Sequence, residues 1–251
     1  MAYASTTRPV RPWIIGHRGS PRDHRENTLR SFLRAFDAGA EAIELDVHGT
    51  VDGAVVIHHD ATTNSRPGES GPRVAIADTT LSALREIPIA DGPIPTLNEL
   101  LARTPGDRAV FVEVKAKGIE TAVVSVIRAA AKQCAVHSFD HRVARRVREV
   151  APEIPVGILQ TSYPIDPLRP MHDADARDLW QHWELIDREL IDAVHADGGR
   201  VIAWTVNDGD VARRLASWGV DGICTDVPAV MRALVDEAVA SRHLAGGKPL
   251  F

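Results

Sequence analysis

Short β-type runs alternate with stretches of helical periodicity along most of this 251-residue chain, and this alternation constrains the fold most strongly. Strands that alternate with amphipathic helices form βαβ units, in which the strands pair in parallel. Eight such units without a glycine-rich dinucleotide turn favour a closed barrel over an open sheet. We therefore predict an α/β fold, a (β/α)8 barrel of the TIM type. Its expected strands are Trp13–His17, Ala42–Val47, Ala109–Lys115, Cys134–Ser138, Val156–Gln160, Glu184–Ile186, Arg200–Val206 and Gly222–Thr225.

The helical stretches carry their apolar residues on one face. In the first, these residues recur at i, i+3, i+4 and i+7, as Leu29, Phe32, Leu33 and Phe36. Asn27 or Thr28 is available as the N-cap, and Gly39 can end the helix. A later helix, from Val211 to Trp218, is expected to end at Gly219.

No break in composition divides the chain, so we predict one domain over residues 1–251. Its regular alternation is interrupted by an insertion at about residues 49–95. The insertion opens with a turn sequence followed by a short strand, which predict a hairpin between Val51 and Ile57. It continues through a Pro/Gly-rich loop, Pro67–Pro72, until Thr96 caps the next helix.

Composition excludes several classes of protein. A net charge of −5 argues against a nucleic-acid binder, which usually presents a basic surface. No apolar run is long enough to cross a bilayer, and Met1–Pro12 lacks the apolar core of a secretory signal, so we expect a cytoplasmic protein without stable membrane insertion. Cys134 and Cys224 lie in apolar runs and are expected to be buried, unpaired thiols. The sequence does not indicate an oligomeric state.

Charged residues stand at alternate positions in two of the predicted strands. Glu44 and Asp46 are two residues apart, as are Glu113 and Lys115. Residues i and i+2 of a strand point to the same side, so each pair shares a face. At the carboxyl ends of barrel strands that face is the mouth, where barrel enzymes keep their chemistry.

Three carboxylates converging from neighbouring strands would repel one another without a cation between them. Glu44, Asp46 and Glu113 therefore predict a divalent metal site, and an oxygen-rich set suits Mg²⁺ or Ca²⁺ better than Zn²⁺. The alternative is that these acids lie at the surface or pair with arginines. Their position inside apolar runs favours the metal site.

Histidines follow two of the strands. His17 ends the first strand, and His58 and His59 end the strand of the hairpin. Two histidines beside a phosphodiester can act as general base and general acid. Only one of His58 and His59 can face a given side, and spacing alone does not decide which.

The same motifs, in this order, resemble those of the glycerophosphodiester phosphodiesterase family, and the resemblance runs from Ile15 to Pro228. They are His17-Arg18-Gly19, Glu26-Asn27-Thr28, Ile43-Glu44-Leu45-Asp46-Val47, His58-His59-Asp60, Glu113-Val114-Lys115, Ser138-Phe139-Asp140, Trp204-Thr205-Val206-Asn207 and Thr225-Asp226. Any one of these would be weak support, whereas the ordered set is specific.

The resemblance implies a role for each candidate residue. It places the divalent metal, Mg²⁺ or Ca²⁺, on the three carboxylates, and it makes His17 and His59 the acid–base pair. His59 is chosen over His58 because the family histidine directly precedes the aspartate. Arg18 and Lys115 are implied to bind the phosphate, which agrees with their charge.

Three further residues are assigned supporting parts. The resemblance turns Trp204 towards the substrate mouth and makes it a candidate binding residue, although an aromatic residue in a strand is usually buried. We expect Glu26 and Asn27 to brace the first loop and cap the helix.

The implied reaction is hydrolysis of a small-molecule glycerophosphodiester to sn-glycerol 3-phosphate and an alcohol. The attacking group is either the neighbouring glycerol hydroxyl, through a cyclic phosphate, or water. One alternative is a lysophospholipase D-type enzyme with a lipid substrate. Another is a non-catalytic barrel that binds a phosphorylated ligand, which predicts the loss of a metal ligand or a histidine, and none is missing.

Overall fold

The computed structural model describes residues 11–64, 71–88 and 92–244, in which parallel strands form a closed barrel. The barrel closes because β1 pairs in parallel with both β2 and β9. This confirms the predicted TIM-type α/β fold, with one additional strand. The barrel strands are β1 (Trp13–His17), β2 (Ala42–Gly49), β4 (Ala109–Val114), β5 (Gln133–Ser138), β6 (Val156–Gln160), β7 (Asp178–His182), β8 (Arg200–Trp204) and β9 (Gly222–Thr225).

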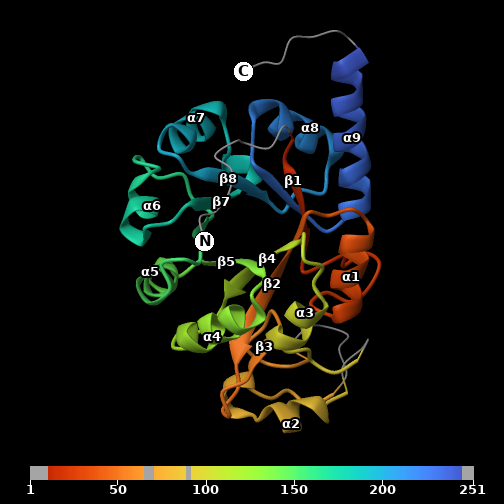
Figure 1. Ribbon diagram of the computed structural model, residues 1–251, viewed down its shortest axis with the longest axis vertical. Coiled ribbons are helices and arrows are strands. Elements are labelled where there is room, and N and C mark those ends of the chain that lie inside the picture. Colours follow the sequence, from red (N-terminus) through yellow and green to blue (C-terminus); the bar gives the residue numbers. More distant parts are fainter. Residues whose placement is uncertain (1–10, 65–70, 89–91, 245–251) are drawn as a thin grey trace.

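Helices follow the barrel strands and form an outer ring around them (Figure 1). In the first helix, the Thr28 side chain accepts a hydrogen bond from the Ser31 backbone N–H, so Thr28 and not Asn27 is the N-cap. Gly39 and Gly219 lie just beyond two of the helices and adopt the left-handed backbone predicted for helix stops. The ring consists of α1 (Leu29–Asp37), α3 (Leu97–Arg103), α4 (Glu120–Ala130), α5 (His141–Val150), α6 (Arg169–Ala174), α7 (Arg188–Ala196), α8 (Gly209–Trp218) and α9 (Pro228–Leu244).

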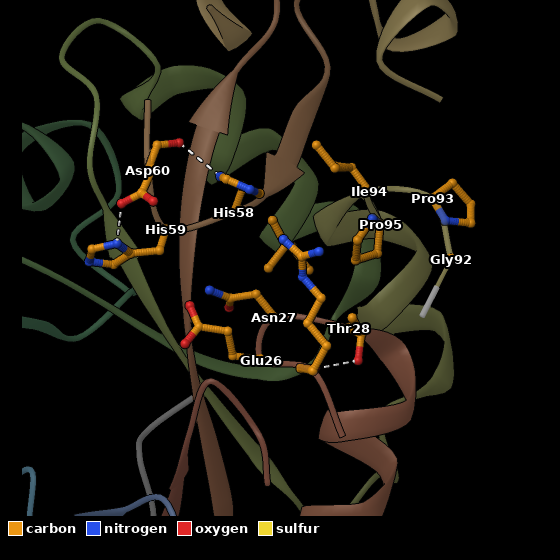
Figure 2. Close-up of a pocket in the computed structure, with 12 residues that line it drawn as sticks. Glu26, Asn27, Thr28, His58, His59, Asp60, Gly92, Pro93, Ile94 and Pro95 are labelled. Atoms are coloured by element: carbon orange, nitrogen blue, oxygen red, sulfur yellow. Dashed lines mark hydrogen bonds and ion pairs between the residues drawn. The ribbon is translucent and has the colours of Figure 1, made fainter. Parts of the chain in front are cut away.

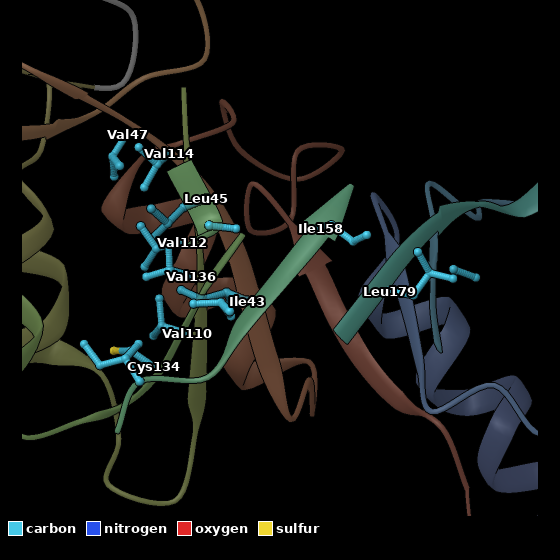
Figure 3. Close-up of a cluster of buried hydrophobic side chains, with 14 of the residues drawn as sticks. Ile43, Leu45, Val47, Val110, Val112, Val114, Cys134, Val136, Ile158 and Leu179 are labelled. Carbon is cyan, nitrogen blue, oxygen red and sulfur yellow. The ribbon is translucent and has the colours of Figure 1, made fainter. Parts of the chain in front are cut away.

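Alternate residues of each strand serve two different cores. Outward residues such as Ile43, Leu45 and Val112 pack between the strands and the helices (Figure 3). Inward residues such as Phe111 and Trp180 fill the barrel interior. Polar residues in phase with the inward set therefore point into the barrel, as the two-residue spacing predicted.

The predicted hairpin is present and supplies the additional strand, β3 (Val55–Ile57), antiparallel to β2. Its turn is closed by the Thr50 N–H, which donates to the Ala54 carbonyl at 2.9 Å. A short 3-10 helix (Ile76–Asp78) and α2 (Leu81–Arg85) follow and pack on a small core of their own. Most of the predicted loop Pro67–Pro72 lies outside the described residues.

The insertion ends at Thr96, the predicted helix cap, which forms a capping box with Glu99. The Thr96 side chain accepts from the Glu99 N–H at 3.2 Å, and the Glu99 carboxylate accepts from the Thr96 N–H at 2.9 Å. These reciprocal bonds satisfy backbone donors at the start of α3, which fixes where the chain rejoins the barrel.

The predicted sixth strand, Glu184–Ile186, is wrong. The strand is β7, Asp178–His182, and residues 183–185 form a 3-10 helix. β7 was missed because it begins with a carboxylate that is wholly buried. Arg177 and Arg200 each donate two hydrogen bonds to Asp178, and these contacts offset the cost of removing its carboxylate from water.

Both cysteines are buried and unpaired, as predicted. Among the described helices, none combines the length and the apolar character needed to cross a bilayer. The expectation that Met1–Pro12 lacks a secretory signal falls mainly on residues outside the described ranges.

Candidate active site

An open cavity with about 480 Å³ of empty space lies at the carboxyl ends of the strands. The predicted catalytic, phosphate-binding and metal-binding residues line it, except for Asp46, which is fully buried beside the cavity wall. The cavity is lined by His17, Arg18, Glu44, His59, Glu113, Lys115, His137, Phe139, Leu159, Trp180, Trp204 and Cys224.

The three predicted carboxylates come from the adjacent strands β2 and β4 and point into the barrel. Asp46 is paired in register with Glu113, and Glu44 with His17 of β1. All three acids are buried, with at most 7% of any of them exposed. The two-residue spacing noted in the sequence therefore places all three carboxylates on the inward face of their strands, close to one another.

Asp46 is held by positive groups and an amide. Arg18 Nε lies 3.1 Å from Asp46 Oδ2 and Lys115 Nζ lies 3.5 Å from Asp46 Oδ1. Asn27 Nδ2 donates to Oδ2 at 2.8 Å. Burial alone would raise the pKa of Asp46, but attraction to Arg18 and Lys115 outweighs burial and lowers it.

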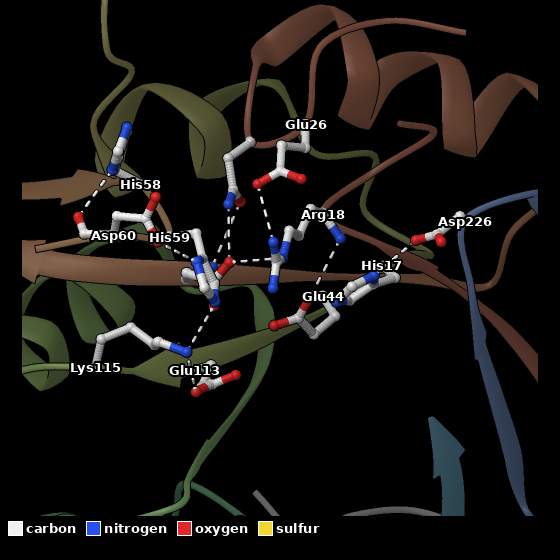
Figure 4. A network of polar contacts seen from close by, with 12 residues as sticks. His17, Arg18, Glu26, Glu44, His58, His59, Asp60, Glu113, Lys115 and Asp226 are labelled. Atoms are coloured by element: carbon white, nitrogen blue, oxygen red, sulfur yellow. Dashed lines mark hydrogen bonds and ion pairs between the residues drawn. The ribbon is translucent and has the colours of Figure 1, made fainter. Parts of the chain in front are cut away.

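Glu44 and Glu113 carry the excess negative charge of the site. Burial, followed by repulsion from Asp46, raises the pKa of both groups above the usual value. Each has one cationic residue beside it: the Arg18 backbone N–H donates to Glu44 at 3.1 Å, and Lys115 Nζ donates to Glu113 at 2.8 Å (Figure 4). Two buried acids with this tendency to take up a proton would be stabilised as carboxylates by a cation.

Ligand atoms of three described residues approach one another closely enough to hold an ion. These are Glu44, Glu113 and His137, whose ligand atoms lie within 4.8 Å of one another. Asp46 is not in this group, although its Oδ1 is buried without a hydrogen bond. The donor set fits a divalent cation, while the predicted set Glu44, Asp46 and Glu113 stays a prediction.

His137 was not found from the sequence. It projects into the barrel from β5, in phase with Ala135, and its imidazole stacks on Trp180 with ring centroids 4.3 Å apart. Burial lowers the pKa of His137 to about 3, so the ring is neutral at pH 7. Strand parity applied to the run Cys134–Ser138 would have placed it beside the acids.

Each predicted catalytic histidine is oriented by an aspartate. His17 Nδ1 lies 2.7 Å from Asp226, and His59 Nδ1 lies 2.7 Å from Asp60 (Figure 4). Since a carboxylate only accepts hydrogen bonds, Nδ1 of each neutral ring carries the proton and Nε2 is left as acceptor. Asn207 Nδ2 in turn donates to Asp226 at 2.6 Å. Asp226 is 209 residues from His17 along the chain, so spacing could not reveal the pair.

Two hollows adjoin His58 and His59: His59 lines both of them, and His58 lines only one. His59 lines the cavity described above, whereas His58 does not. His58 lies in a neighbouring hollow bounded by the first loop and the segment before α3, and its Nδ1 is 2.9 Å from the Asp60 carbonyl (Figure 2). The sequence left open which of the two histidines faces the acids, and in the structure it is His59.

Glu26 and Asn27 both brace the first loop, as expected. Glu26 Oε1 accepts from Arg18 Nη1 at 2.9 Å and so holds the guanidinium in place. Asn27, expected to cap the helix, instead binds Asp46 from a left-handed backbone conformation. The Asn27 amide therefore orients the buried carboxylate of Asp46, a role that the sequence did not predict.

Aromatic rings form one wall of the mouth. Trp204 meets Phe139 edge-to-face, with centroids 5.4 Å apart, and His182 at 5.5 Å. Trp180 lies deeper, in the barrel interior, while Trp183 packs against the outer core. The structure thus places Trp204 at the cavity, where the sequence expected it.

Comparison with known proteins identifies the family. The model of the glycerophosphoryl diester phosphodiesterase family matches residues 17–230. A glycerophosphodiester phosphodiesterase from Caldanaerobacter subterraneus is 30% identical over 239 residues, covering 88% of this chain and 97% of the relative.

Solved structures agree with the sequence match. A phosphodiesterase from Oleispira antarctica, in complex with the product sn-glycerol-3-phosphate, is 26% identical with a TM-score of 0.80, over 90% of this chain and 97% of that one. A glycerophosphodiester phosphodiesterase from Thermotoga maritima is 27% identical with a TM-score of 0.79, over 89% of this chain and 98% of that one. Matched along most of its length in both sequence and fold, the chain belongs to the glycerophosphoryl diester phosphodiesterase family, whose enzymes hydrolyse glycerophosphodiesters.

Proposed function

We propose that this enzyme hydrolyses glycerophosphodiesters to sn-glycerol 3-phosphate and an alcohol, with His17 and His59 as the acid–base pair and a divalent cation in the site. One observation carries the proposal: two imidazoles, each oriented by its own aspartate, share a cavity with buried acids, Arg18 and Lys115. Paired histidines provide both proton transfers that a phosphodiester needs, one at the nucleophile and one at the leaving alcohol.

We assign His59 to proton removal. Burial, together with the positive charges of Arg18 and Lys115, lowers the pKa of His59 despite attraction from Asp46. A bound cation would lower this pKa further, so the ring is neutral near pH 7 and its Nε2 can accept a proton. His17, paired with Asp226, is then the group that protonates the leaving alkoxide.

Arg18 and Lys115 neutralise the phosphate. Both side chains line the cavity with the histidines, and ion pairs to Asp46 hold both of them in position. The guanidinium offers a fork of donors to two phosphate oxygens, and the ammonium acts as a point charge. Trp204 is proposed to pack against the organic part of the substrate.

The cation is proposed to bind Glu44, Asp46 and Glu113, with Mg²⁺ or Ca²⁺ expected from oxygen ligands alone. When bound, it neutralises the phosphate charge and lowers the pKa of the attacking hydroxyl or water. The raised pKa of Glu44 and of Glu113 supports a cation at this position.

The decisive experiment measures release of glycerol 3-phosphate from glycerophosphocholine and glycerophosphoethanolamine with Mg²⁺, Ca²⁺ or EDTA. We expect turnover that EDTA abolishes and added metal restores. Turnover that is indifferent to EDTA would refute the metal requirement. A transient cyclic glycerophosphate, detected by ³¹P NMR, would identify the glycerol hydroxyl as the attacking group, and its absence would indicate direct attack by water.

A lipid substrate is a second candidate, favoured by apolar side chains on loops at the same end of the barrel. Phe139 follows β5, and Tyr163 and Ile165 follow β6, and all three are exposed. Such side chains can contact an acyl chain. Release of choline from lysophosphatidylcholine at a rate above that from glycerophosphocholine would establish this lysophospholipase D-type activity.

A further inference from the structure

The His137 imidazole has no hydrogen-bond partner within the described part of the chain. Both of its nitrogens are buried and make no hydrogen bond, and only 1% of the residue is exposed. Leaving a buried polar group unpaired costs about 1–3 kcal/mol. A histidine kept only for packing would be expected to satisfy at least one nitrogen, as His195 does with Asp221 at 2.9 Å.

The stacking of His137 explains its orientation but not its polar atoms. The ring lies parallel to Trp180, with an interplanar angle of 7°, and meets the edge of Phe111. These contacts would serve a phenylalanine equally well. They hold the plane of the imidazole, so its nitrogens point along that plane.

A nitrogen of this ring approaches the acids of the cation site. His137 Nε2 lies 3.8 Å from Glu44 Oε1, which is too long for a hydrogen bond. Two ligands that each lie about 2.1 Å from one ion are at most about 4.2 Å apart, so 3.8 Å suits shared coordination. Glu113 completes a group whose ligand atoms lie within 4.8 Å of one another.

We infer that His137 is a nitrogen ligand of the bound cation, and that the site takes a first-row transition ion such as Co²⁺ or Mn²⁺ more tightly than Mg²⁺ or Ca²⁺. This inference rests on the proposed function only in assuming that the site binds a metal. Oxygen ligands alone suit Mg²⁺ and Ca²⁺, whereas an imidazole in the set favours transition ions. A neutral imidazole offers one nitrogen lone pair for coordination, and neither nitrogen of His137 makes a hydrogen bond that would occupy it.

The direct test is pulsed EPR on the Mn²⁺-loaded full chain. We expect the ¹⁴N modulation of a coordinated imidazole in the wild type and its loss in His137→Phe, which keeps a ring on Trp180, and in His137→Gln. His182→Gln is the matched control, because this imidazole lies at the same mouth but outside the ligand group, and it should keep the signal.

Calorimetric titration gives the second readout. Loss of one ligand should weaken Co²⁺ binding by about tenfold or more in both His137 variants, while Mg²⁺ affinity changes by less than about threefold. Wild-type protein that binds Mn²⁺ without ¹⁴N coupling would overturn the inference and leave the proposed function intact, whether or not the variants fold. Wild-type protein that binds no ion, with turnover unaffected by EDTA, would overturn both.

Discussion

At the scale of single residues, the active site depends on pairs rather than on isolated groups. Each proposed catalytic histidine is held by an aspartate, and each buried glutamate lies beside a positive residue. A substitution at either member of a pair therefore changes the orientation or the charge of the other.

Replacing His59 should remove the proton acceptor while leaving the cation site in place. We expect His59→Ala to lower kcat by about 10²–10⁴-fold, the usual contribution of general acid–base catalysis. Metal affinity, measured by calorimetry, should be nearly unchanged. His58→Ala is the matched control, since His58 does not line the cavity, and its turnover should stay close to wild type. Comparable turnover in His59→Ala would remove this residue from the mechanism.

Asp226 should act through His17, and a neutral substitute tests this role. We expect Asp226→Asn to lower kcat on glycerophosphocholine by about 10²-fold, with little change in KM, because the imidazole loses the carboxylate that orients it. The loss should largely disappear with a glycerophospho-p-nitrophenol substrate, whose leaving group needs no proton.

Exposed Asp210 on α8 provides the control for that experiment, and Asp210→Asn should leave both rates unchanged. An equal loss on both substrates in Asp226→Asn would mean that Asp226 is merely structural or acts elsewhere in the reaction.

At the scale of elements, the barrel strands position the site and polar contacts beneath them fix the strands. β7 begins with Asp178, which is wholly buried and bound by one arginine next to it and one on β8. Because this cluster lies at the amino ends of the strands, away from the active-site cavity, its contribution is to stability.

We expect Asp178→Asn to lower the free energy of unfolding at pH 7 by about 3–5 kcal/mol, since it leaves two arginines without their charge partner. Burial would raise the pKa of Asp178, but Arg200 and Arg177 hold it far below the usual value. The contribution of a carboxylate with a depressed pKa is fully present above the unfolded pKa of about 3.9, declines as pH falls below that value, and is lost only as pH falls through the folded pKa. The difference between variant and wild type should therefore narrow between pH 7 and pH 3.

Chemical denaturation at pH 7 and pH 3 measures both effects. Asp173→Asn removes an exposed partner of Arg169 on α6 and should change stability by no more than about 0.5 kcal/mol. A difference between Asp178→Asn and wild type that persists unchanged at pH 3 would contradict the ionic explanation.

At the scale of the whole molecule, the cation site links ligand binding to global stability. An ion at about 100 times its Kd stabilises the folded state by about 2.7 kcal/mol. For a chain of this length that corresponds to a Tm increase of about 5–10 °C, which EDTA should reverse in differential scanning calorimetry.

The charge on the acids should set the direction of this effect. Glu44→Gln removes part of the repulsion among the buried carboxylates, so its metal-free Tm should equal or exceed that of the wild type. The shift on adding metal should shrink in this variant. A full shift in Glu44→Gln would place the ion elsewhere.

Strand periodicity predicted most of the barrel and which residues face its interior. It failed at β7, because Asp178 makes a buried strand look like exposed chain until the two arginines are known. It also missed Asp226 and His137. Asp226 meets His17 only through the pairing of β1 with β9, a contact between the two ends of the chain. The alternation along β5 would have turned His137 into the barrel, but its role could not be predicted, since its surroundings come from three other strands.

The meeting of β1 and β9 also has a consequence for synthesis of the chain. His17 is translated with β1, whereas its aspartate follows β9, 209 residues later. A nascent chain that already carries Arg18, Glu44, Asp46 and Glu113 lacks the partner that orients this imidazole. The ribosome thus delivers the proposed metal and phosphate ligands before the aspartate that orients the proposed acid, and we expect hydrolysis only after β9 has closed the barrel.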